Sequence, residues 1–127
     1  MMTKVAENAA IEVMENHIDA LNNLDEERLI KTLHFPHYRL AGTRLTCWHT
    51  SERYLADFRE RAGDRWASSK WNTMYVQRSS NDKVHLLVEV IRLDNYDKVI
   101  TSFESLWVIT PQEQKWAALF RSSFAES

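Results

Sequence analysis

The sequence predicts an α+β fold in which helices pack on one face of an antiparallel β-sheet. In the first half of the chain apolar residues recur at helical spacing, whereas from Trp66 onward apolar and polar residues alternate as in β-strands. Three clusters of turn-forming residues divide the second half into strands: SSND at 79–82, DNYD at 94–97 and PQEQ at 111–114. Helices followed by a meander of four strands are typical of the α+β class.

The first helix is expected over residues 4–22. It carries an apolar stripe with His17 at its border, where we expect this histidine to be partly buried with a partner. Asp25 caps a short second helix, DEERLIKTL, which should end before Pro36 because a proline pushes the preceding residue out of the helical region. The stripe of the first helix consists of Ile11, Met14, Ile18 and Leu21.

A small hairpin and a third helix should complete the first half. The segment after the proline reads as two short strands that turn near Gly42. Thr50 or Ser51 can cap the third helix, SERYLADFRERA, and Gly63 can close it.

Length and composition favour one domain over residues 1–127. The chain is 44% hydrophobic and 27% charged, which suits a globular core without disulfides. A net charge of -2 and the absence of charge runs argue against a nucleic-acid partner. Cys47 is the only cysteine, and no segment reads as a membrane span or signal peptide, so we expect a cytoplasmic protein with no membrane partner.

Alternation within the meander sorts its side chains onto two faces, if each turn cluster is a four-residue loop. The helices should cover the face that carries Trp71, Tyr75, Thr101, Trp107 and Ser122. The opposite face is too apolar to stay in water, so we expect it to form a homodimer. In this register Glu104 lies opposite Arg121 as a cross-strand pair. The candidate dimer face consists of Met74, His85, Leu87, Glu89, Glu104, Leu106, Leu119 and Arg121.

The order of elements resembles the nuclear-transport-factor-2-like superfamily, and more narrowly its bacterial SnoaL-like proteins, many without an assigned activity. The resemblance rests on HFPHYRL after the short helix, and on FESLWVIT and WAALFRSSFA in the last strands. It covers nearly the whole chain. It implies a strongly bent sheet curled around helices into a cone, with a mainly apolar pocket inside and dimer contacts on the outer face.

The resemblance also implies a class of chemistry. Ketosteroid isomerases, polyketide cyclases and scytalone dehydratase of this superfamily rely on an Asp inside the cone, often with Tyr or His. The inward strand positions here offer no carboxylate, and Asp57 lies off the apolar side of the third helix. Arg92, near the end of an inward row, could bind an anionic substituent at the pocket rim or form a surface ion pair. The candidate pocket residues are His37, Trp48, Tyr54, Phe58, Trp71, Tyr75, Thr101, Trp107 and Ser122.

Three histidines, His34, His37 and His49, invite a metal or a catalytic role. Their spacing matches no diagnostic metal motif, and the chain has no glycine-rich phosphate loop, so we expect neither metal nor cofactor. Histidines at the cone mouth could act as acid and base. We favour a structural interpretation, in which the HFPH segment ends a helix and the imidazoles bond carbonyls of its last turn.

Two functions remain open at this point. The first is a protein that binds a small, mainly apolar molecule in its cone, with isomerase, cyclase or dehydratase-like chemistry as the resemblance implies. The alternative is a non-catalytic dimeric scaffold whose cone is filled by its own aromatic side chains. A cavity of a few hundred cubic ångströms is typical of a ligand site and separates the two.

Overall fold

The computed structural model describes residues 2–61 and 65–125 and contains three helices and one six-stranded sheet among them. The strand order is β2-β1-β6-β5-β4-β3. All neighbouring strands are antiparallel except β1 and β6, which run parallel, so the sheet is mixed. The elements are α1 (Met2–Asn22), α2 (Glu26–Lys31), β1 (Leu33–Ala41), β2 (Arg44–Trp48), α3 (Ser51–Arg61), β3 (Ser68–Ser79), β4 (Val84–Leu93), β5 (Val99–Gln112) and β6 (Lys115–Ser123).

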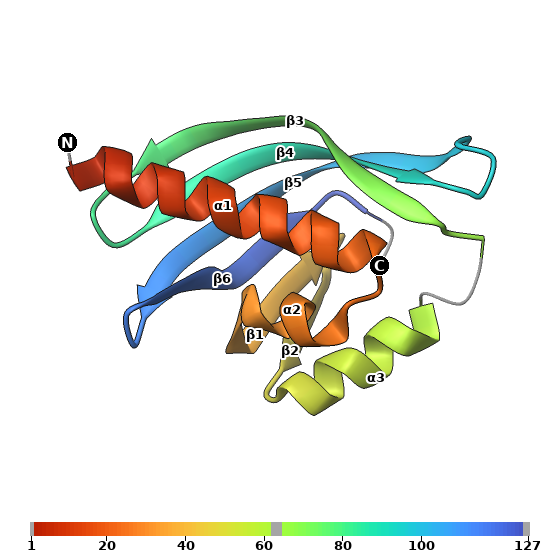
Figure 1. Ribbon diagram of the computed structural model, residues 1–127, viewed down its shortest axis with the longest axis horizontal. Helices are drawn as coiled ribbons and strands as arrows, with labels where there is room; N and C mark the ends of the chain where they lie inside the picture. The colour runs from red at the N-terminus through yellow and green to blue at the C-terminus, as the bar shows by residue number, and fades with distance from the viewer. Residues whose placement is uncertain (1, 62–64, 126–127) are drawn as a thin grey trace.

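The sheet is strongly bent and α1 lies across its concave side, as Figure 1 shows. The buried side of α1 carries small residues, Ala6, Ala10 and Ala20, which let the helix approach the strands closely. A hydrogen bond connects β3 to α1, because the indole Nε1 of Trp71 donates to the Met14 carbonyl at 2.9 Å. The helices α2 and α3 lie below α1 beside the β1–β2 hairpin (Figure 1). The predicted α+β layout is confirmed.

The short helix α2 begins as predicted and ends earlier. The Asp25 side chain accepts a hydrogen bond from the Arg28 backbone nitrogen at 3.2 Å, which caps the helix. The helix ends at Lys31, and Pro36 lies inside strand β1 rather than at a helix end. The β1–β6 pairing is irregular between Leu33 and Tyr38, so the proline sits where regular ladder bonds are already interrupted. The prediction that HFPH ends a helix is therefore wrong.

The connections between strands are close to those predicted. The turn of the first hairpin contains Gly42, whose φ of 58° suits a glycine. The predicted loop at 111–114 is shorter, since β5 continues to Gln112 and β6 begins at Lys115. Glu113 and Gln114 both have positive φ, 52° and 65°, as in the tight two-residue turns of β-hairpins. The predicted closure of the third helix at Gly63 lies outside the described residues.

Two irregularities exchange the faces of strand segments. In β3 the register shifts between Trp71 and Thr73, and beyond it Met74 packs against the core while Tyr75 is 58% exposed. In β6 the register of pairing with β5 shifts at Leu119, so that Arg121 lies opposite Trp107. Each shift inserts one residue, which moves the side chains after it to the other face. In β3 this holds as far as a second shift between Val76 and Arg78.

These shifts overturn parts of the face assignment. Met74 and Arg121 are not on the outer face, and Tyr75 is not on the inner one. Ser122 pairs with Leu106 and alternates with the buried Arg121 and Ser123, so its inward placement is also wrong. Glu104 lies opposite Glu89 instead of Arg121.

None of the helices in the described part of the chain has the length and hydrophobicity needed to cross a membrane.

Candidate functional site

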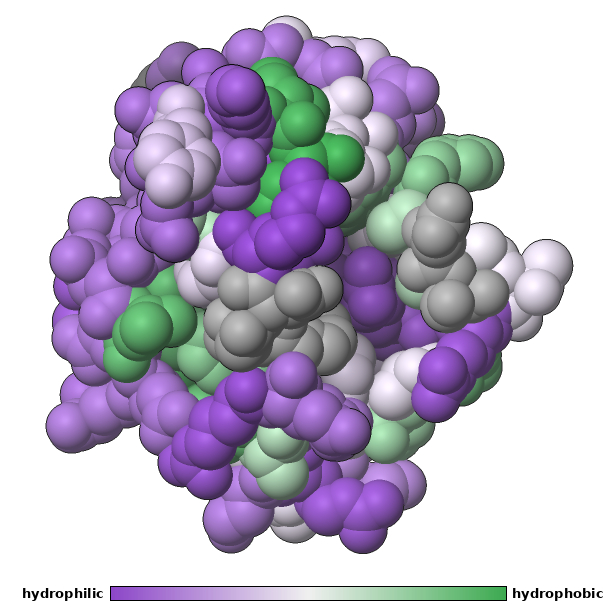
Figure 2. Space-filling view, turned by 90° about the vertical axis from the view of Figure 1, so that its right-hand side faces the viewer, coloured by the Kyte–Doolittle hydropathy of each residue, from purple (hydrophilic) through white to green (hydrophobic). Residues whose placement is uncertain are grey.

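A cavity of about 640 Å³ lies between the concave face of the sheet and the helices α1 and α3. This volume is within the range of small-molecule sites. Figure 2 views the end of the molecule on the right of Figure 1 and shows a hollow with hydrophilic side chains at its floor. The cavity is lined by His17, Ile18, Leu21, Arg39, Tyr54, Phe58, Arg65, Trp66, Ser69, Trp71, Val90, Arg92, Ile100, Thr101, Phe103, Ser105, Trp107, Arg121, Ser123 and Ala125.

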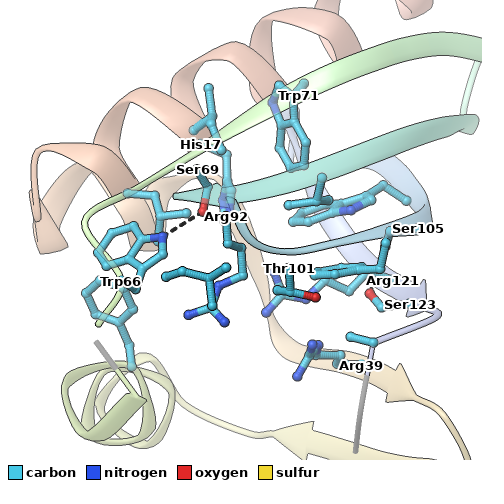
Figure 3. Close-up of a pocket in the computed structure, with 18 of the residues that line it drawn as sticks. His17, Arg39, Trp66, Ser69, Trp71, Arg92, Thr101, Ser105, Arg121 and Ser123 are labelled. Carbon is cyan, nitrogen blue, oxygen red and sulfur yellow. Dashed lines mark hydrogen bonds between the residues drawn. The ribbon is translucent and has the colours of Figure 1, made fainter. Parts of the chain in front are cut away.

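Arginines from three strands reach this cavity. Arg39 of β1 and Arg121 of β6 are register partners on adjacent strands, and Arg92 of β4 lies opposite Thr101 of β5. Figure 3 shows these side chains gathered around one space. Arg121 is only 8% exposed, and its guanidinium carbon lies 4.9 Å from the centre of the Trp107 ring. This is cation–π geometry, which orients the guanidinium and partly compensates its burial.

Aromatic rings form the wall toward α1. Trp71 and Trp107 meet edge to face, with ring centroids 5.5 Å apart, and His17 contacts both. The Trp66 indole Nε1 donates to Ser69 Oγ at 2.8 Å, as the dashed line in Figure 3 marks. Since the indole nitrogens of Trp66 and Trp71 are both engaged, these rings are held in fixed orientations before any ligand arrives.

His17 is a buried titratable group in the cavity wall. Thr32 Oγ1 donates to the Leu29 carbonyl at 2.7 Å, so it accepts from His17 Nδ1 at 2.8 Å. The proton therefore sits on Nδ1, and Nε2 keeps a lone pair. Burial, and secondarily the positive charge of Arg121, lower the pKa of His17 to about 3. The imidazole is thus a neutral hydrogen-bond acceptor at neutral pH.

The remaining polar lining is made of hydroxyl groups. Ser105 Oγ lies 2.8 Å from Ser123 Oγ, and Thr101 stands at the mouth. Among the described residues that line the cavity, none is Asp or Glu. Asp57 is engaged elsewhere, because its Oδ2 accepts from the Trp48 indole at 2.7 Å. The described lining of the cavity is therefore rich in arginine and aromatic side chains rather than mainly apolar.

Five of the nine predicted pocket residues line the cavity: Tyr54, Phe58, Trp71, Thr101 and Trp107. His37 and Trp48 lie one layer deeper, where their rings stack with centroids 6.0 Å apart and Trp48 lies under the Arg121 guanidinium. Tyr75 and Ser122 do not line the cavity, because the register shifts in β3 and β6 turn their side chains away from the concave face. Sequence reasoning missed Arg39 and Arg121, and placed His17 only as a partly buried residue.

The three histidines singled out by the sequence do not converge. His34 Nε2 donates to the Thr110 carbonyl at 2.7 Å, and His37 Nδ1 donates to the Ala118 carbonyl at 2.9 Å. Both partners are strand carbonyls, not carbonyls of a helical turn. Burial lowers the pKa of both rings. His49 Nε2 lies 3.7 Å from Cys47 Sγ at the surface. In the described ranges, no three His, Cys, Asp or Glu side chains come together as metal ligands.

Five of the eight residues predicted for the dimer face lie on the convex side of the sheet: His85, Leu87, Glu89, Glu104 and Leu106. Tyr75, Leu87 and Leu106 form a row across three strands there. Glu89 and Glu104 form a neighbouring row, and Asn72 Nδ2 donates to Glu89 Oε1 at 2.6 Å. His85 lies opposite Val108, and Leu119 occupies the irregular position of β6.

Solved structures of other proteins share this architecture. An NTF2-like protein of unknown function from Pseudomonas putida KT2440 has a TM-score of 0.79 at 12% identity, over 97% of this chain and 88% of its own. An NTF-2 like protein from Shewanella oneidensis MR-1 has a TM-score of 0.77 at 10% identity, over 93% and 98%. The chain has the nuclear-transport-factor-2-like fold. This confirms the predicted resemblance at the level of fold.

The nuclear-transport-factor-2-like fold also includes a candidate aromatic ring hydroxylase from Novosphingobium aromaticivorans. Its TM-score is 0.72 at 13% identity, over 91% of this chain and 85% of its own. A scan of protein-family models finds no match for the sequence, and a search of curated proteins finds none either.

Proposed function

We propose that this protein binds a small organic molecule in the cavity of its cone. The observation that carries the proposal is a space of about 640 Å³ that the protein's own aromatic side chains leave open. Protein interiors are close-packed, so a cavity of this size is a costly feature for a scaffold and an ordinary one for a ligand site. The scaffold alternative required a filled cone and is therefore the weaker hypothesis.

The lining supports binding more directly than it supports a particular reaction. Rings held by hydrogen bonds offer flat surfaces, and His17 offers an acceptor. A base with a pKa of about 3 is too weak to remove a proton at neutral pH in the unliganded protein. The proton-transfer chemistry of the isomerases and dehydratases with this fold is therefore a weaker candidate than ligand binding.

A thermal-unfolding screen tests the proposal. The purified protein is heated with a panel of small aromatic and apolar compounds, both neutral and charged. A compound at one hundred times its dissociation constant adds about 2.7 kcal/mol of stability, which raises the unfolding midpoint visibly. Thr101→Trp, which places a ring at the cavity mouth, should abolish the shift. Tyr75→Ala is the matched control, because Tyr75 lies outside the cavity and the shift should persist.

The absence of a thermal shift would favour the hypothesis of a non-catalytic dimeric scaffold. If no compound in a broad panel shifts the midpoint of the folded protein, the cavity has no role in binding small molecules. If Thr101→Trp shifts normally while Tyr75→Ala does not, binding takes place on the convex face instead.

A further inference from the structure

Resting on the proposed function, we infer that the ligand is a flat aromatic molecule with a hydrogen-bond donor, an O–H or an N–H, and that this donor binds Nε2 of His17. The inference names the chemical class of the ligand and the atom that recognises it. It rests on a buried imidazole whose acceptor atom borders the cavity, and on the aromatic rings around that imidazole.

Thr32 fixes the tautomer of His17. The Thr32 hydroxyl gives its only proton to the Leu29 carbonyl, so toward His17 Nδ1 it can only accept. Thr32 is itself held in place, because its backbone nitrogen donates to the Leu29 carbonyl at 3.1 Å and its carbonyl accepts from the Ala118 nitrogen at 2.8 Å. The proton is therefore kept on Nδ1, and the lone pair is on Nε2, which points away from Thr32.

Nε2 of His17 borders the cavity. Among the described residues, none hydrogen-bonds to this atom. The packing of those residues does not enclose it either, so it opens onto the space that His17 lines. Figure 3 shows His17 on the α1 side of this space. Because the side chain is only 2% exposed, and buried polar atoms are nearly always hydrogen-bonded, Nε2 is suited to a donor that enters with a ligand.

The neutral imidazole selects a donor without removing its proton. Burial lowers the pKa of His17 to about 3, so at neutral pH the ring offers a lone pair at Nε2 and no N–H. A buried acceptor favours ligands that bring an O–H or N–H and disfavours analogues without one, because the acceptor is then left unpaired. The inference therefore concerns binding and orientation of the ligand.

Aromatic rings around His17 define the body of the ligand. The Trp71 ring stacks on the imidazole with centroids 6.3 Å apart, and the Trp107 ring meets it edge to face at 5.0 Å. Trp71 is held by its hydrogen bond to the Met14 carbonyl. Rings that do not have to be ordered on binding cost little entropy, so they favour a flat and rigid partner over a flexible chain. A donor attached directly to an aromatic ring matches both His17 and its surroundings.

Matched compounds test this inference by titration calorimetry at neutral pH. Naphthalen-2-ol is compared with 2-methylnaphthalene, which has nearly the same shape and no donor, and with 2-methoxynaphthalene, which keeps the oxygen and lacks the donor. Indole and 1-methylindole form the corresponding pair for an N–H, so the two sets show which kind of donor the cavity takes. We expect the compound with the donor to bind about tenfold or more tightly in at least one set.

Variants locate the recognition, and the quantity compared is the ratio of dissociation constants within a set, which cancels differences in hydrophobicity between variants. His17→Phe keeps a flat ring and removes Nε2, so the preference for the donor should fall by about tenfold or more. Thr32→Val removes the group that holds the proton on Nδ1, and should also reduce the preference although Thr32 does not line the cavity. This second variant remains informative if His17→Phe fails to fold. His49→Phe, at an exposed histidine outside the cavity, is the matched control and should keep the full preference.

The outcomes separate this inference from the proposed function. A preference that is the same in His17→Phe and in the unmodified protein would overturn the role of His17 and leave a small-molecule site in place. Equal affinity for naphthalen-2-ol and 2-methoxynaphthalene, with none for indole over 1-methylindole, would overturn the donor class. An unchanged preference in Thr32→Val would overturn the assigned tautomer. Absence of binding by every member of such sets built on naphthalene, biphenyl and indole would overturn both the inference and the proposed function.

Discussion

His17 shows how one side chain connects the core of this molecule to its cavity. It is 2% exposed, its Nδ1 proton is committed to Thr32, and it lies against two tryptophan rings. Protonation of Nε2 would place a second positive charge near Arg121 inside the cone. The low pKa of His17 follows from that burial and that neighbour.

The protonation of His17 predicts how stability depends on pH. The folded pKa is about 3 and the unfolded value is about 6.5, so below pH 6.5 the unfolded chain binds more protons. Stability should therefore fall as the pH is lowered from about 6.5 toward about 3, and this group should have no effect at higher pH. His37, whose pKa is also lowered by burial and by Arg121, acts in the same direction.

Urea unfolding between about pH 6 and pH 5 measures this effect, because carboxylates contribute mainly below that range. In His17→Asn the slope of unfolding free energy against pH should decrease by about 1 kcal/mol per pH unit, since one proton fewer is taken up on unfolding. The amide of asparagine can keep the bond to Thr32. An unchanged slope would mean that His17 becomes protonated in the folded protein.

At the scale of elements, the irregularity in β3 decides which side chains enter the core. Beyond Asn72, Met74 and Val76 pack against the core, and Tyr75 points to the convex side. Met74→Ala should therefore cost about 1–2 kcal/mol, less than a fully buried methionine because the side chain is half-buried. Tyr75→Ala should cost clearly less. Chemical denaturation measures the difference, at a protein concentration low enough to exclude self-association. If Tyr75→Ala cost more stability than Met74→Ala, the side chains of β3 would alternate without the irregularity.

The elements themselves could be predicted from the sequence because their signals are local. The cap at Asp25, the turn at Gly42 and the polar cluster at residues 79–82 each mark a boundary within a few residues. The inward valines and leucines of β4 also follow from simple alternation, because its pairing with β5 is regular over most of its length.

Two arginines that line the cavity could not be predicted in the same way. Arg121 changes face because Leu119 is an extra residue in β6, and an extra residue leaves no mark in the pattern of a strand that is already rich in apolar and small side chains. Arg39 lies beside it only because β1 pairs in parallel with β6, a contact between distant parts of the chain. The predicted residues on α3 and on strand segments without an irregularity line the cavity, whereas Tyr75 and Ser122 lie beyond a register shift and do not.

At the scale of the whole molecule, the convex face of the sheet predicts a second subunit. The row Tyr75, Leu87 and Leu106 runs beside a row of His85, Val108, Phe120 and Tyr38, so apolar side chains cover this face over adjacent strands. A contiguous apolar surface of this kind is uncommon on a monomer. A two-fold axis through the face would bury the same rows on both subunits.

Sedimentation velocity tests the homodimer. We expect the unmodified protein to sediment as a dimer, and Leu106→Arg to sediment as a folded monomer, because the substitution places a charge in the middle of the apolar rows. Thr43→Arg, in the exposed turn between β1 and β2, adds the same charge away from this face and should leave the dimer intact. A dimer that persists in Leu106→Arg would place the interface elsewhere.

The monomeric variant should keep its ligand-induced thermal shift, since Leu106 points away from the cavity. If the monomeric variant bound no ligand, the cavity would keep its shape only when the sheets of two subunits support each other.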